Sequence, residues 1–341
     1  MPKRQEKNEQ IRQFILENVE DHPTDITSVV ATEFSVSRQA SHRHIQRLVN
    51  DGLLIPKGVT RNRTYDVKPV ASFYKLLKLK GLEEDKVWRQ DILPLMANIP
   101  QNILQICHHG FTEMVNNAID HSEGTNLKII ALRTYKLIEL QVSDNGVGIF
   151  NKIQREFNLD DPLHAILELS KGKLTTDPAH HSGEGIFFTS RIFDQFTILS
   201  DKLSFEHLES DNDWLLENKD TVFSGTLVDM RIDLRSKQTT QQVFNRYTSD
   251  DFGFTKTHVP VFLARYGNEN LVSRSQAKRL LTRFERFREI VLDFDNVESI
   301  GQAFADEIFR VFASNNPSVH LIPMNTNEQV RKMIAHVKNA I

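Results

Sequence analysis

The sequence predicts a multidomain protein in which α/β and α+β architectures follow one another in three parts. Its 341 residues exceed the ~250–300 at which a single hydrophobic core stops growing. The spacing of apolar residues also changes along the chain, from helical spacing, through strand-like runs, to strands that alternate with helices. These observations predict domains over 1–70, 91–240 and 255–341, with a linker over 71–90.

Composition limits where the protein works and what it binds. The net charge of −3 gives no overall attraction to nucleic acid, so any such binding must come from a local basic patch. Cys107, the single cysteine, excludes an intramolecular disulfide framework, suits a reducing compartment and is expected to be buried among apolar neighbours. No apolar run approaches ~18 residues and no signal peptide opens the chain, so we expect a cytoplasmic protein with no membrane partner.

The first 70 residues predict helices followed by a β-hairpin. Apolar residues recur at helical spacing, Ser35 or Ser37 would cap the third helix, and Gly52 would end it. The helices are expected over 11–19, 25–31 and 37–49, and the hairpin strands over 53–55 and 63–67. From Phe34 to Lys68 there are seven Lys or Arg and two Asp, a local charge of +5.

This order resembles the winged helix-turn-helix domains of bacterial transcription regulators. The resemblance implies DNA binding by a recognition helix in the major groove and by a wing on the phosphates. The groove residues would be Arg38, Gln39, Ser41, His42 and Arg43, and the wing residues Lys57, Arg61 and Arg63. The alternative is a winged helix that contacts only other proteins.

Two polar clusters mark the middle of the chain. Glu113 and Asn117 are four residues apart on a helix expected over 103–122, so they project from one face. A carboxylate there could polarise water, and a carboxamide oxygen could hold Mg²⁺. Two strands follow, Leu127–Leu132 and Leu137–Val142. The second runs into Asp144 and a glycine turn, where a ligand could approach the backbone because glycine has no side chain.

These clusters resemble motifs of the GHKL superfamily of ATPases, which includes gyrases, heat-shock chaperones, histidine kinases, mismatch-repair ATPases and anti-sigma-factor serine kinases. Glu113, Asn117 and Asp120 match the first motif. Asp144, Gly146 and Gly148 match the adenine-binding DxGxG motif, residues 182–186 the second glycine box, and residues 224–228, which include Thr226, the closing strand. Rossmann and Walker A sites are excluded, because neither GxGxxG before a helix nor GxxxxGK[ST] occurs.

The resemblance implies a Bergerat α/β sandwich that binds ATP and Mg²⁺. Glu113 would be the general base, Asn117 would hold Mg²⁺, and Asp144 would accept a hydrogen bond from the adenine amino group. Gly183 and Gly185 would surround the phosphates, although Glu184 between them departs from the family's glycine-rich pattern. The segment 150–181 would contain the mobile ATP lid. The complete nucleotide-binding set is Asn117, Asp120, Asp144, Gly146, Gly148, Gly183, Gly185 and Thr226.

The last part of the chain predicts parallel strands covered by helices. Strands are expected over 258–264, 290–294 and 319–322, and helices over 274–287, 303–312 and 328–337. This order resembles the STAS domains of anti-sigma-factor antagonists, which GHKL serine kinases phosphorylate. Ile300 rather than Ser299 falls at the acceptor position, and Ser299, Ser273 and Ser275 are expected to be helix caps.

The three resemblances together predict a cytoplasmic ATP-binding regulator. Binding or hydrolysis of Mg-ATP would gate DNA binding through residues 1–70, or binding of a protein partner through the STAS-like domain, and a homodimer is compatible with this. The alternative is a Ser/Thr protein kinase that acts on its own STAS-like domain or on a partner. A gyrase-like motor is disfavoured because nothing after Leu234 resembles a transducer domain, and a histidine kinase because no phosphoacceptor helix pair precedes the motif helix.

Overall fold

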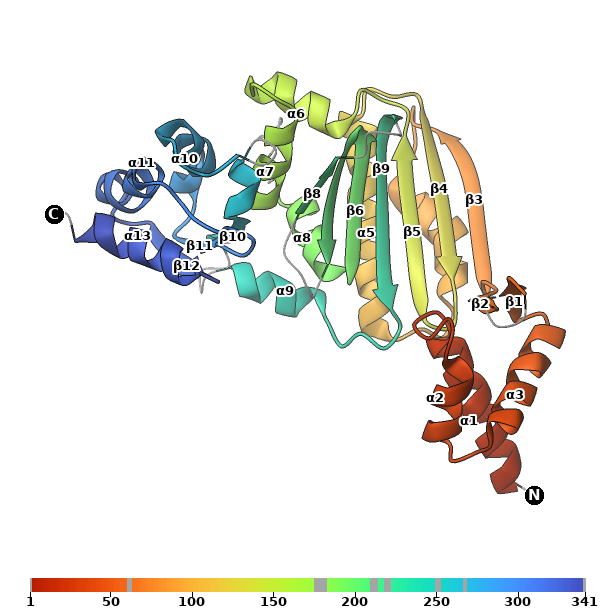
Figure 1. Ribbon diagram of the computed structural model, residues 1–341. Helices are drawn as coiled ribbons and strands as arrows, with labels where there is room; N and C mark the ends of the chain where they lie inside the picture. Colours follow the sequence, from red (N-terminus) through yellow and green to blue (C-terminus); the bar gives the residue numbers. More distant parts are fainter. Residues whose placement is uncertain are drawn as a thin grey trace.

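The computed structural model describes residues 2–59, 63–174, 183–208, 214–217, 222–248, 253–265 and 269–339. Figure 1 shows a group of helices and a small hairpin at one end, a large antiparallel sheet in the middle, and a second α/β unit at the other end. Arg61 and Ser182, which the sequence analysis singled out, lie outside the described residues.

Within the described residues, the N-terminal unit has three helices and a two-stranded hairpin, in the order expected from the sequence. The elements are α1 (Pro2–Asn18), α2 (Ile26–Glu33), α3 (Arg38–Asn50), β1 (Leu54–Lys57) and β2 (Thr64–Val67). Ser37 caps α3, because its Oγ accepts a hydrogen bond from the Ala40 N–H at 3.1 Å. The buried apolar residues of this unit, from Ile11 to Val67, form a hydrophobic core of their own.

The central sheet has seven strands in the described residues, in the order β3-β4-β5-β9-β6-β7-β8, and each adjacent pair is antiparallel. The strands are β3 (Ala71–Lys78), β4 (Asn126–Arg133), β5 (Leu137–Asp144), β6 (Gln195–Asp201), β7 (Leu203–Leu208), β8 (Trp214–Glu217) and β9 (Phe223–Asp233). The expected linker over 71–90 is therefore corrected, since β3 pairs with β4 along its whole length.

Helices cover one face of this sheet (Figure 1). The longest is α5 (Gln101–His121), which buries Ile103, Cys107 and Phe111 at helical spacing. It is preceded by α4 (Glu84–Val87), a π-helical turn (Trp88–Ile92) and a 3₁₀ turn (Leu93–Met96). The remaining helices of this unit are α6 (Ile149–Phe157), α7 (Leu163–Lys171), α8 (Gly185–Ile192) and α9 (Thr240–Tyr247). Cys107 is fully buried as expected, and burial raises the pKa of its thiol.

The C-terminal unit is built on a parallel sheet in the order β10-β11-β12. Its elements are β10 (Lys256–Pro260), α10 (Arg274–Leu281), β11 (Glu289–Asp293), α11 (Gln302–Asp306), α12 (Ala313–Asn315), β12 (His320–Met324) and α13 (Glu328–Lys338), with a π-helical segment (Glu307–Phe312) joining α11 to α12. The strand expected over 258–264 ends earlier in the structure, at Pro260. Pro260 lacks a backbone N–H, and residues 261–264 form a 3₁₀ turn.

The helix expected over 274–287 also ends early, at Leu281. Arg283 adopts the left-handed conformation (φ 67°), which breaks the helix, and a 3₁₀ turn (Phe284–Arg286) follows. Ser273 caps α10 as expected, in a capping box with Gln276, whereas Ser275 lies within the helix. The N-cap of α11 is Gly301, so Ser299 is not the cap that the sequence suggested.

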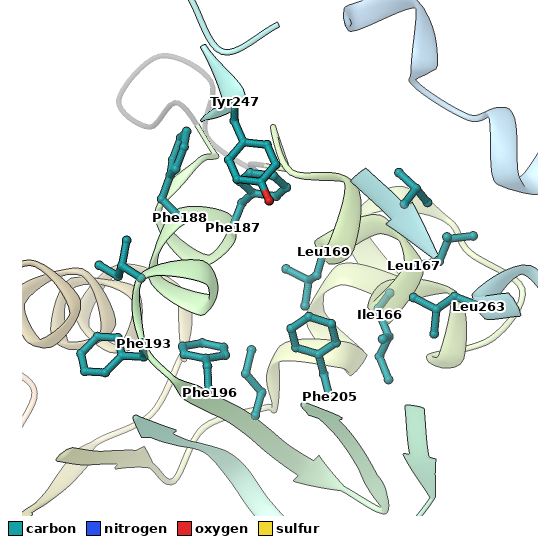
Figure 2. Packing of buried hydrophobic residues seen from close by; sticks show 14 of the residues in the cluster. Ile166, Leu167, Leu169, Phe187, Phe188, Phe193, Phe196, Phe205, Tyr247 and Leu263 are labelled. Atoms are coloured by element: carbon teal, nitrogen blue, oxygen red, sulfur yellow. The ribbon is translucent and has the colours of Figure 1, made fainter. Parts of the chain in front are cut away.

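One hydrophobic core extends from the central sheet into the C-terminal unit, in contrast to the separate core of the N-terminal unit. Helix α7 connects the two sides. In Figure 2, Ile166 of α7 lies between Phe205 of β7 and Leu263 of the C-terminal unit, and all three side chains are buried. The central and C-terminal parts are therefore packed as one body, which the boundaries expected from the sequence did not suggest.

Candidate functional site

A cavity of about 330 Å³ opens between α5, the ends of β5 and β9, and the helices α6, α7 and α8. Both polar and apolar side chains line it. The polar and glycine residues are Glu113, Asn117, His121, Ser122, Asp144, Gly148, Lys152, Gly183, Gly185 and Thr226. The apolar residues are Met114, Ala118, Val142, Ile149, Ile153, Phe157, Leu169, Leu174, Ile186, Phe187 and Val228.

Helix α5 places both of its predicted site residues on this cavity. Glu113 and Asn117 lie one turn apart and line it, and His121 continues the same row by one further turn. The Nδ2 atom of Asn117 lies 4.0 Å from Met114 Sδ. Asp120 is exposed and, unlike Glu113 and Asn117, is not among the residues that line the cavity.

Asp144 ends β5 at the inner side of the cavity and is 8% exposed. Its Oδ1 atom accepts hydrogen bonds from the N–H of Gly146 at 2.8 Å and of Thr226 at 3.3 Å. Burial raises the pKa of this carboxyl, and the two N–H donors act against that rise by stabilising the carboxylate. Gly146 is not in the cavity wall, so its contribution is to hold Asp144 through its backbone.

The strand β9 and the turn before α6 close this side of the site. Thr226 Oγ1 accepts a hydrogen bond from Ile149 N–H at 3.0 Å, which ties the start of α6 to β9. Gly148 precedes α6 with φ 83°, and a Cβ atom there would lie 2.5 Å from Ser200 Oγ. A side chain at position 148 would therefore be both strained and obstructed.

The second glycine pair lies opposite α5. Gly183 lines the cavity, and its carbonyl accepts a hydrogen bond from Leu174 N–H at 3.1 Å. Gly185 begins α8, where a Cβ atom would lie 2.2 Å from Glu113 Oε2, so a side chain at position 185 would displace that carboxylate from its present position. Glu184, between them, is outside the cavity wall, and burial raises the pKa of its carboxyl.

Several cavity residues were missed by sequence reasoning because α6 was treated as part of a loop. Ile149, Ile153 and Phe157 recur every four residues, which is the amphipathic pattern that could have revealed this helix. Lys152, on the same helix, brings a cation to the cavity, and its Nζ lies 3.2 Å from Glu123 Oε1. Phe187 is a core residue, 1% exposed, that also forms part of the cavity wall.

A magnesium ion would need ligands from both protein and nucleotide. Among the described residues, no group of three or more His, Cys, Asp or Glu side chains is arranged to hold a metal. The carboxamide of Asn117 is in the cavity, and Mg²⁺ is commonly bound by one or two protein ligands together with phosphate oxygens and water. The residues present therefore fit a magnesium nucleotide better than a free metal ion.

Most of the predicted DNA-contacting residues are exposed on α3 or on the hairpin. Arg38, Gln39, His42 and Arg43 are exposed on α3. Ser41 is a correction, because it is fully buried and its Oγ donates to the Ser37 carbonyl at 3.2 Å. In the hairpin, Lys57 is exposed and paired with Asp66, and Arg63 is also exposed.

Comparison with known families identifies only the C-terminal unit. Residues 276–331 match a STAS-like domain of unknown function (DUF4325), so the chain carries a C-terminal STAS-like domain, as expected from the sequence. Among curated proteins, none matches the chain. Ile300, which the sequence analysis aligned with the STAS phosphoacceptor, is buried and forms a β-bridge with Leu271, and Ser299 is half-buried. None of the helices in the described part of the chain is sufficiently long and apolar to cross a bilayer.

Proposed function

We propose that this protein is a GHKL-type ATP-binding regulator in which Mg-ATP in the cavity controls the N-terminal or the STAS-like domain. The supporting observation is the cavity itself. Residues from four motifs that are far apart in sequence line the same space, namely Glu113 and Asn117, Asp144 and Gly148, Gly183 and Gly185, and Thr226. Its volume of about 330 Å³ is within the range of small-molecule pockets, roughly 300–1,000 Å³.

The chemistry of the walls suggests which part of a nucleotide would lie where. Asp144 is a buried acceptor among apolar residues such as Val142 and Val228, which suits an adenine ring with its amino group. The Glu113 carboxylate lies against Gly185, and Asn117 lines the same cavity one turn later on α5, which suits the phosphates. When bound, magnesium ATP supplies the terminal phosphate, and Glu113 would accept the proton of an attacking water through its carboxylate.

The first test is nucleotide binding measured by calorimetry on the full chain. Asp144→Asn should weaken ATP binding about 10- to 100-fold, because a charged acceptor is lost and an NH₂ group is placed against the adenine amino group. Asp229→Asn is the matched control. Asp229 is equally buried (9% exposed) but projects from the opposite face of the same sheet, where burial raises its pKa to about 6. Wild-type affinity in Asp144→Asn would refute the assignment of the adenine site.

DNA binding through a winged helix-turn-helix is the output that we propose for residues 1–70. Its support is that Arg38 and Arg43 on α3 and Arg63 of the hairpin are basic and exposed. Such binding should weaken as salt rises, with a log–log slope of about −0.9 per phosphate neutralised. Arg63→Ala should flatten that slope on all sequences, whereas Arg43→Ala should relax base preference.

The measurement is a gel-shift series on genomic fragments upstream of the gene, with and without ATP. Lys332→Ala, which removes one positive charge from an exposed side chain at the other end of the chain, serves as the control. Salt-independent binding, or equal binding by wild type and Arg63→Ala, would exclude this surface as the DNA interface. The protein would then be assigned a protein partner in place of DNA.

A further inference from the structure

A buried polar cluster joins α7 to the STAS-like domain directly behind the cavity. Glu168 is 3% exposed and Lys171 is fully buried. The Glu168 carboxylate accepts from Lys171 Nζ at 2.5 Å and from Arg283 Nη1 at 2.7 Å. Lys171 Nζ also donates to the carbonyls of Arg279 and Thr282, at 3.2 and 3.1 Å. One carboxylate from α7 and two cations therefore form the junction between the two parts of the chain.

The same junction holds the backbone that leaves α7. Arg283 Nη2 donates to the carbonyls of Gly172 at 2.8 Å and Lys173 at 2.5 Å. Thr257 of β10 donates from Oγ1 to the Lys171 carbonyl at 2.7 Å. Three successive carbonyls, at positions 171 to 173, are thus bound by side chains of the STAS-like domain and its first strand.

This segment is also part of the cavity wall. Leu169 and Leu174, on either side of the bound carbonyls, line the cavity, and Leu174 bonds to Gly183, which lines it too. Phe187 lines the cavity and also packs on Phe254, with the two ring centroids 4.6 Å apart. Residues 169–174 therefore form a wall that lines the cavity and is also bound to the C-terminal part of the chain.

We propose that the STAS-like domain holds residues 169–174 of the cavity wall in place through intramolecular contacts, so that docking of this domain and ligand binding in the cavity are coupled. We call these contacts the latch, and Arg283 is its positioning residue. The latch holds the wall in its binding conformation, and a free segment would have to be ordered by the ligand at a cost in affinity. Linkage makes the effect reciprocal, so a ligand in the cavity also favours the docked domain. The identity of that ligand as ATP rests on the proposed function.

Arg283→Asn tests the latch, because asparagine tolerates the left-handed backbone that Arg283 adopts while removing the guanidinium. Hydrogen exchange of residues 164–174 is followed in the nucleotide-free full chain, and ATP affinity is measured by calorimetry. We expect faster exchange in the wall and roughly tenfold weaker ATP binding, within the usual range of coupling between sites. Arg331→Asn is the control, since Arg331 is exposed on α13 in the same domain.

The outcomes separate the latch from the proposed function. If wild type binds no ATP, the nucleotide function fails, while the exchange data still decide whether Arg283 holds the wall. Unchanged exchange in Arg283→Asn overturns the latch, and faster exchange with unchanged ATP affinity overturns the coupling. If Arg283→Asn does not fold, Thr257→Val removes only the bond to Lys171 and should show the same changes to a smaller degree.

Discussion

Replacing Glu113 by Gln should leave ATP binding close to that of the wild type and lower steady-state hydrolysis by ~10²-fold or more, the usual contribution of a general base. Glutamine has nearly the same shape as glutamate, so it should fit against Gly185, where the carboxylate now lies. What it lacks is a basic oxygen that can take a proton from water. Phosphate release and calorimetry on the same preparation separate the two effects.

Two further variants make this result specific. Glu156→Gln, at an exposed position on α6, removes the same kind of charge outside the cavity and should hydrolyse ATP at the wild-type rate. Asp120→Asn compares the sequence motif with the geometry, because Asp120 matches the motif but lies outside the cavity wall. If Asp120→Asn loses as much turnover as Glu113→Gln, Asp120 belongs to the functional site although it does not line the cavity. Full activity in Glu113→Gln would remove Glu113 from the role of base.

The destination of the phosphate distinguishes the two candidate functions. With γ-labelled ATP, a regulator that hydrolyses its nucleotide releases label as free phosphate, whereas a kinase retains it on a protein side chain. The environment of Ile300 gives the kinase alternative little support within this chain, because the residue that we aligned with the STAS phosphoacceptor is a buried aliphatic side chain. Label recovered on the protein would nevertheless decide in favour of the kinase, and its position would identify the acceptor.

The parts of the site that the sequence could predict are those governed by local spacing. Glu113 and Asn117 were placed on one helix face because residues four apart on a helix are neighbours, and both line the cavity. Asp144 was placed at a strand end before a glycine turn, and β5 ends at that residue. Ser37 and Ser273 were identified as caps because their side chains satisfy the first N–H groups of the following helices.

What the sequence could not predict depends on contacts between distant segments. β3 is an edge strand in which Phe73 and Leu77 pack on the core while Tyr74 and Leu76 are exposed. Its apolar residues therefore do not alternate with polar ones along the sequence, and the region 71–90 resembled a linker. Ser41 is polar, but α3 turns it toward the core, where it bonds to the Ser37 carbonyl. Nothing in the sequence around Lys171 indicates that it is buried, and only the fold shows that Glu168, one turn before it, pairs with both Lys171 and Arg283.

The buried cluster of Glu168, Lys171 and Arg283 leads to the largest expected change in stability. Glu168→Ala should lower the free energy of unfolding by about 3–5 kcal/mol, because it leaves two buried cations without their shared carboxylate. Chemical denaturation of the full chain would measure this. Glu328→Ala is the control, since Glu328 pairs with Lys332 at a site where both side chains are more than 70% exposed, and its loss should cost at most about 1 kcal/mol.

The pH dependence of the stability of Glu168→Ala shows whether Lys171 is the buried charge left without its partner. Burial lowers the pKa of Lys171 below its ordinary value of 10.5, and Glu168 opposes that shift, so removing Glu168 should lower this pKa further. Between the lowered pKa and 10.5 the unfolded chain binds more protons than the folded one, so the stability of Glu168→Ala should rise with pH across that window. Adding Lys171→Met should recover part of the lost stability and remove the pH dependence. A loss that is independent of pH and unaffected by Lys171→Met would mean that Glu168 acts by packing, and that its charge does not hold the junction together.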